Sequence, residues 1–150
     1  MLKLSRKTLL ALEAVIDIAF NARPEPVQAK EITARQGVPQ RYLEQVMQQL
    51  VRAGVLKGVR GPRGGYRLAK ERRRITVGEI VRVAESLDDD DGETVAPRSD
   101  LGTRIVGPLI ASLQDEVMAR LDAISIEDLC ARARAAGVDC GGASAGDFII

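Results

Sequence analysis

Three arginines and three glycines lie close together in VRGPRGGYRL, residues 59–68. Glycine and proline at this density indicate a tight turn, and the apolar residues at its edges indicate two short strands. A turn that only reverses the chain has no use for the arginines. Guanidinium groups bind phosphates and enter narrow minor grooves, while glycines let the main chain approach closely. The turn therefore predicts contact with a nucleic acid. The residues expected to make it are Arg60, Gly61, Arg63, Gly64 and Gly65.

A second set of polar side chains lies on the segment PQRYLEQVMQQLVRA, residues 39–53. Its apolar residues recur at three- and four-residue steps, which predicts a helix with one buried side. The other faces can read bases, because Gln pairs with adenine, Arg with guanine, and Glu accepts from the cytosine amino group. For this helix alone, an ordinary solvated face is the alternative. The candidates are Gln40, Arg41, Tyr42, Glu44, Gln45 and Gln48.

The elements predicted around this helix match the pattern of a DNA-binding fold. Residues 5–22 have the apolar spacing of a helix, and residues 28–36 form a shorter helix closed by Gly37. A short helix joined through glycine to a longer one is the helix-turn-helix pattern. Two strands, within 55–60 and 66–70, flank the glycine turn. We therefore expect a mainly α fold with a small β-wing, a winged helix-turn-helix.

The second half of the chain predicts a linker and a pairing element. A capping box at Thr76 opens a helix over 77–87, and four consecutive aspartates follow it. A long helix over 104–124 is apolar over more than one stripe, which favours pairing with a second copy; packing on the first helix is the alternative. The dimerisation residues are Ile105, Leu109, Leu113, Val117 and Leu121. We expect a DNA-binding domain at 1–87, an acidic linker at 88–103, a dimerisation helix and short final helix at 104–137, and a flexible tail at 138–150.

Charge is divided unevenly along the chain. Residues 1–76 carry 16 Lys and Arg against 6 Asp and Glu, whereas residues 77–150 carry 6 against 15. A basic half of this kind indicates a polyanion as partner, and chance placement of solvated charges is the alternative. Double-stranded DNA is the partner we expect. Weaker phosphate contacts are predicted at Lys3, Arg6, Lys7, Lys57 and Arg67. Lys70 and Arg72 to Arg74 extend the basic stripe, with solvation alone as their alternative.

Other classes of function find little support in these residues. The chain has no histidine, no phosphate-binding loop after a strand, and no convergent carboxylates outside the linker, so we do not expect an enzyme. The first residues have the pattern of an amphipathic helix and no apolar run is long enough for a membrane span, so we expect a cytoplasmic protein without membrane contact. Cys130 and Cys140 do not make a disulfide framework. They are candidates for an oxidant-sensitive disulfide, or else one core thiol and one tail thiol.

The stretches RYLEQVMQQLVRAGVLKGVRGPRGGYRLAK and ITVGEIVRVAE resemble the bacterial winged-helix regulators typified by the iron–sulfur cluster regulator IscR and the cysteine-metabolism repressor CymR. The resemblance covers residues 1–87 well. It implies a homodimeric DNA-binding transcription factor, most often a repressor, with a palindromic operator. It places Tyr42, Glu44 and Gln45 in the major groove, and Arg60 with the turn 61–65 at the minor groove. The alternative is a winged-helix module that binds a regulatory partner protein and not DNA.

One departure from that family concerns its cofactor. Many members carry three cysteines, often with a histidine, between the wing domain and the long helix, and these hold a [2Fe–2S] cluster. Here that segment, 88–103, has neither residue type, so we expect a cluster-free member with no cofactor. A cluster shared by Cys130 and Cys140 across a dimer is the minor alternative. The remaining inputs are a partner protein, thiol oxidation, or a cation at Asp88 to Asp91, where a solvated linker is the alternative.

Overall fold

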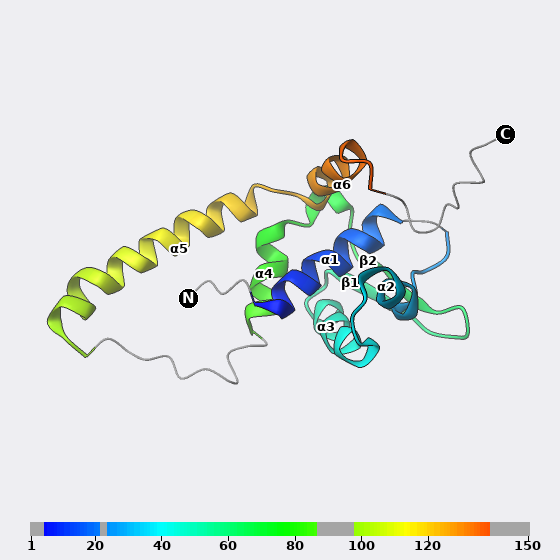
Figure 1. The fold of residues 1–150 in the computed structure, drawn as a ribbon, viewed down its shortest axis with the longest axis horizontal. Coiled ribbons are helices and arrows are strands. Elements are labelled where there is room, and N and C mark those ends of the chain that lie inside the picture. Colours follow the sequence, from blue (N-terminus) through cyan, green and yellow to red (C-terminus); the bar gives the residue numbers. More distant parts are fainter. Residues whose placement is uncertain (1–4, 22–23, 87–97, 139–150) are drawn as a thin grey trace.

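The computed structural model of this chain describes residues 5–21, 24–86 and 98–138. The predictions for Lys3, for Asp88 to Asp91 and for Cys140 lie outside these residues, as do most of the linker and the tail. The fold is mainly helical with one small antiparallel sheet, as the sequence predicts (Figure 1). None of the helices in the described ranges combines the length and apolarity that crossing a membrane requires.

The first three helices include the predicted helix-turn-helix, which is formed by the second and third. They are α1 (Arg6–Phe20), α2 (Ala29–Gln36) and α3 (Gln40–Arg52). Ser5 caps α1 by accepting a hydrogen bond from the Thr8 amide, and Gly37 ends α2 in the left-handed conformation, as its position in the sequence predicts. Only three residues then separate α2 from α3, so the two helices pack against each other across a short turn.

The wing is a hairpin of β1 (Leu56–Val59) and β2 (Gly65–Leu68), paired in register from Leu56–Leu68 to Val59–Gly65. Val27, in the connection between α1 and α2, bridges to Tyr66 with two backbone hydrogen bonds of 3.0 and 2.8 Å. The hairpin is therefore tied to the helix-turn-helix as well as to itself. Its loop projects away from the helices at the right of Figure 1.

The core gathers around α1, which packs against α3, α4 (Val77–Ser86) and α6 (Ile126–Ala135). From the sequence, we expect the final short helix to belong with the long helix. In the structure it lies on α1 and on the short 3₁₀ turn η1 (Arg72–Arg74), and its Ile126 and Cys130 are fully buried. The last helix therefore completes the core of the N-terminal domain, after the chain has left that domain and returned.

The long helix begins earlier than residue 104. Ser99 accepts a hydrogen bond from the Gly102 amide, and a π-helical turn, η2 (Gly102–Val106), leads into α5 (Gly107–Asp122). Pro108 explains the wider turn, because it has no amide hydrogen to continue an α-helical ladder and the Gly107 amide donates to the Gly102 carbonyl instead. Figure 1 shows α5 reaching away from the rest of the protein. Over its whole range it has no buried residue.

Candidate nucleic-acid interface

The outward face of α3 presents the predicted base-reading residues. The apolar side of the helix, Leu43, Val46, Met47 and Leu50, is buried in the core, so the orientation of the helix is fixed. Gln40, Arg41, Gln45 and Gln48 are exposed, whereas Tyr42 and Glu44 are half-buried. The side-chain amide Nε2 of Gln40 donates to the Glu44 carboxylate at 3.0 Å, one turn further along the helix. Side chains that donate hydrogen bonds and side chains that accept them therefore face solvent along one helix.

A hollow of about 260 Å³ lies beside this face, between α1 and α3. It brings Lys7 of α1 together with Tyr42, Gln45 and Gln48, which the sequence analysis assigned to two different kinds of contact. Val46, Gln49 and Arg52 also line it. Gln49 and Arg52 were not among the predicted contacts. Their spacing of four and seven residues from Gln45 places all three on one helix face, and this is the signal that identifies them.

Each of three wing glycines is required by local geometry. Gly61 has φ 112°, a conformation that L-amino acids rarely adopt. A side chain at Gly64 would overlap with the carbonyl oxygen of Val59, and one at Gly65 would overlap with that of Val27. The turn must therefore be built from glycine to close the hairpin and to let β2 lie against the α1–α2 connection.

The cations of the wing divide into two groups. Arg60 and Arg63 in the loop and Lys57 on β1 are exposed to solvent. Arg67 on β2 is also exposed, but its guanidinium donates to the main-chain carbonyl of Pro24. Arg67 therefore ties the wing to the α1–α2 connection, a role that its position in the sequence did not indicate.

The basic stripe that follows the wing is largely paired within the protein. Carboxylates contact three of its four cations: Lys70 pairs with Glu79 at 2.6 Å, Arg73 with Glu71 at 2.6 Å, and Arg72 with Glu127 on α6. Any phosphate bound there would compete with these carboxylates. The wing loop and α3 are consequently the better-placed cationic surface.

Tyr66 links the wing to the recognition helix electrostatically. It lies half-buried on β2, and burial, followed by the negative charge of Glu44, raises the pKa of its hydroxyl above the usual 10.0. The shift is away from neutral pH, where the hydroxyl is protonated as in an ordinary tyrosine and can donate a hydrogen bond.

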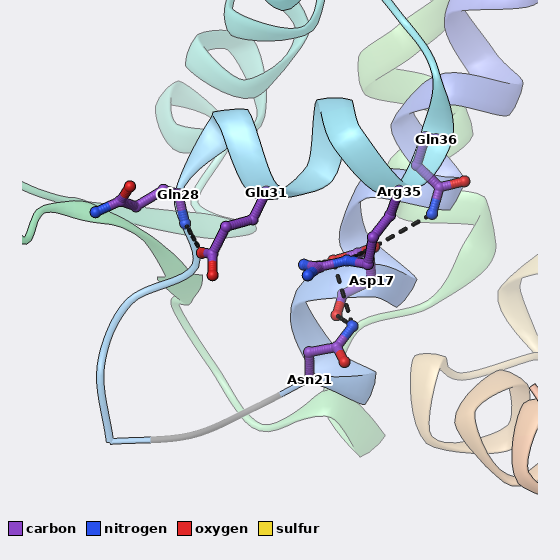
Figure 2. A network of polar contacts seen from close by, with 6 residues as sticks. All are labelled: Asp17, Asn21, Gln28, Glu31, Arg35 and Gln36. Atoms are coloured by element: carbon purple, nitrogen blue, oxygen red, sulfur yellow. Dashed lines mark hydrogen bonds and ion pairs between the residues drawn. The ribbon is translucent and has the colours of Figure 1, made fainter. Parts of the chain in front are cut away.

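A buried carboxylate positions α2, and through it the turn before α3 (Figure 2). The side chain of Asp17 on α1 is only 3% exposed, and Arg35 donates to both of its oxygens, at 2.8 and 2.6 Å. Gln36 and Asn21 add hydrogen bonds of 3.2 and 3.4 Å. The hydrogen bond to Asp17 and the negative charge of that carboxylate raise the pKa of the Arg35 guanidinium. This network is not among the features predicted from the sequence, although a single aspartate within an apolar helix is its signal.

The predicted dimerisation residues lie where a partner helix can reach them. Ile105, Leu109, Leu113 and Val117 are exposed, and Leu121 is half-buried near the end of α5 that approaches α4. A single chain leaves this apolar surface in water over the entire helix, which favours an intermolecular contact over the intramolecular alternative.

The residues of this chain do not fit a [2Fe–2S] cluster. Such a cluster takes four protein ligands, chiefly thiolates, and one chain has two cysteines and no histidine, so a cluster would need Cys130 and Cys140 from two chains. Cys130 is fully buried on α6, and burial raises the pKa of its thiol above the usual 9.0. Among the described residues, no three His, Cys, Asp or Glu side chains gather in a group that could hold a metal ion.

A helix-turn-helix with its recognition face exposed, followed by a glycine-built basic hairpin, defines the winged-helix class of DNA-binding folds. The comparisons agree, since residues 4–132 match the family Rrf2, described as iron-dependent transcriptional regulator. The chain belongs to the Rrf2 family.

Two curated relatives and two solved structures illustrate the similarity. The HTH-type transcriptional regulator IscR of Vibrio atlanticus (strain LGP32) is 42% identical over 88 residues, which are 58% of this chain and 51% of that protein. The chain thus spans about half the length of that relative. IscR of Aliivibrio salmonicida is 34% identical over 85% of this chain and 77% of its own. The structure of T. potens IscR has a TM-score of 0.72 at 32% identity, covering 92% of this chain and 93% of that one. The structure of CymR, the global cysteine regulator of B. subtilis, has a TM-score of 0.70 at 32% identity, covering 88% of this chain and 98% of that one.

Proposed function

We propose that this chain is a sequence-specific DNA-binding transcriptional regulator of the cytoplasm, which represses its targets as a homodimer on a palindromic operator. The observation that carries the proposal is that one folded core holds two candidate DNA-binding elements, α3 and the wing. The exposed polar face of α3 and the exposed arginines of the wing extend from one packed core, and the Val27–Tyr66 bridge ties the wing to the connection between α1 and α2. Recognition helices read the major groove, and wing arginines reach phosphates or the minor groove beside it.

The homodimer in this proposal follows from α5. A helix with no buried residue and apolar side chains along its length gains stability when a second copy covers it. The helix-turn-helix and wing of each chain, together with the core that holds them, form its DNA-binding head. Two identical heads related by a two-fold axis then require two half-sites of inverted sequence. The proposal includes no [2Fe–2S] cluster, because the cysteines of this chain do not fit the ligand set that the resemblance implies for such a cluster.

The test is selection of bound duplexes from a random-sequence library, followed by affinity measurements over a range of salt. We expect a palindromic motif and a steep loss of affinity with salt, because each phosphate contact releases counterions. Arg60→Ala should weaken binding to every duplex and reduce the slope of the salt dependence by about 1. Glu44→Ala should instead relax one base position, where discrimination falls by about 1–3 kcal/mol.

Arg132→Ala is the matched control, since Arg132 is exposed on α6. Recovery of no duplex at low salt would favour the protein-interaction module over the regulator. Parental motif and affinity in both the Arg60 and the Glu44 variants would remove these two residues from the interface.

A further inference from the structure

The connection between α5 and α6 is joined to the start of α4 by main-chain hydrogen bonds. The Val77 amide donates to the Ile124 carbonyl, and the Ile126 amide donates to the Ile75 carbonyl, both at 2.9 Å. Together they form an antiparallel bridge at Thr76. Ile75 and Ile126 are fully buried beside it, so the bridge is anchored in the core of the DNA-binding head.

An ion pair between two partly exposed side chains spans the same joint. Arg82 on α4 donates to both carboxylate oxygens of Asp122, the last residue of α5, at 2.7 and 2.6 Å. Such a two-pronged pair fixes direction as well as distance. Gly78 lies directly beneath it. A Cβ there would overlap with the Asp122 carboxylate and would lie 2.9 Å from its Cγ and 3.1 Å from its main-chain nitrogen. Gly78 therefore leaves the space that the Asp122 carboxylate occupies.

This joint determines the direction of the long helix. Apart from its own π-helical turn, α5 meets the described part of the chain chiefly at α4. Its 16 residues form a lever roughly 24 Å long. A tilt of about 8° at one end displaces the other by roughly 3.4 Å, the rise of one base pair. A small change of angle at the joint therefore moves the far end of α5 by a distance comparable to one base pair.

We propose that Gly78, Arg82 and Asp122 determine the spacing between the two half-sites that the dimer accepts. The inference rests on the proposed function, because it requires a homodimer held together by α5. In such a dimer each head is placed by the angle at which it leaves its long helix. The joint then acts as a specificity determinant that touches no DNA, while α3 and the wing read each half-site.

The experiment uses a set of duplexes in which the selected half-site is repeated with one base pair added or removed at the centre, together with a duplex that carries one half-site. The parent should prefer one spacing. Gly78→Ala displaces the Asp122 carboxylate, so binding at the parental spacing should weaken about tenfold and the preference should move by a base pair or more. Asp122→Ala should broaden the preference, because it releases Arg82.

The two changes should not add. In the Asp122→Ala background the clashing Oδ1 and Cγ are absent, so Gly78→Ala should cause little further change. Asp115→Ala, an exposed carboxylate on the same helix, is the matched control and should behave as the parent. Affinity for the single half-site should be equal in all these proteins, which separates spacing from folding.

Parental spacing preference in both Gly78→Ala and Asp122→Ala would overturn the inference, as would a parent that binds all spacings equally. In either case binding to the single half-site would leave the proposed function intact. A parent that binds none of the duplexes would remove the proposed function itself. Asp122 is on the surface, so its variant carries the test if Gly78→Ala does not fold.

Discussion

At the scale of single residues, Asp17 is the buried charge on which the arrangement of α1 and α2 depends. Its carboxylate accepts hydrogen bonds from Arg35, Gln36 and Asn21 while only 3% of its side chain is exposed. Asp17→Asn leaves the Arg35 cation without its counter-charge. We expect the free energy of unfolding to fall by about 3 kcal/mol. Urea denaturation measures it, with exposed Glu13→Gln on the same helix as control.

A double variant separates this charge effect from packing. Replacing the pair by apolar residues, Asp17→Leu with Arg35→Met, should recover much of the stability that Asp17→Asn loses, because neither charge is then left unpaired. Parental stability of Asp17→Asn would show that the network does not hold α2.

Cys130 belongs to the same scale. Its thiol is buried in the core and burial raises its pKa, and both oppose the accessible thiolate that iron binding requires. Protein purified without air should therefore be colourless and contain no stoichiometric iron or sulfide, as elemental analysis will determine. A brown preparation that loses its colour in Cys130→Ser would contradict the position of this thiol.

At the scale of elements, α6 depends on the cap that begins it. Ser125 and Asp128 form a reciprocal capping box, in which the Ser125 amide donates to the Asp128 carboxylate at 2.9 Å and the Asp128 amide to the Ser125 hydroxyl at 3.1 Å. Serine followed three residues later by aspartate is a sequence pattern typical of such a cap. The hydrogen bond from the Ser125 amide, followed by that from its side chain, lowers the pKa of Asp128 below 3.8.

The sign of the pH dependence follows from that direction. A carboxyl whose pKa is lower in the folded state stabilises the fold above its unfolded pKa, and this stability is lost as pH falls through the folded pKa. Asp128→Asn should therefore melt below the parent at neutral pH, and the difference in Tm should close as pH drops from about 5 to below the folded pKa of Asp128. Thermal denaturation across this range measures it. A difference that stays constant with pH would mean that the charge on Asp128 has no part in the cap.

At the scale of the whole molecule, the long helix connects the proposed dimer contact to the DNA-binding head. Leu113 is exposed at mid-helix among other apolar side chains. Leu113→Asp would place a charge in the contact at a cost of several kcal/mol and should shift the protein from dimer to monomer. Ala111→Asp adds the same charge on the opposite face and should leave the dimer intact. Sedimentation at micromolar concentration compares the two, and a monomeric parent would end the dimer proposal.

The sequence by itself determined the local elements of this protein. Apolar residues at helical spacing predicted α1, α3 and α5, Gly37 predicted the end of α2, and the glycines of residues 61–65 predicted the hairpin. These signals depend on neighbours within a few residues, so a single sequence carries them in full. The candidate DNA contacts came from the same short-range patterns, which is why most of them lie exposed on α3 and the wing.

Only the tertiary structure decided what pairs across the chain. The sequence does not show that Asp17 meets Arg35, that Arg67 is bound to the Pro24 carbonyl, or that α6 returns to the core beside α1. Nor does it show that Gly78 leaves room for Asp122, 44 residues away along the chain. Such contacts depend on how packed elements are oriented in three dimensions, and side-chain types and their local spacing do not specify that orientation.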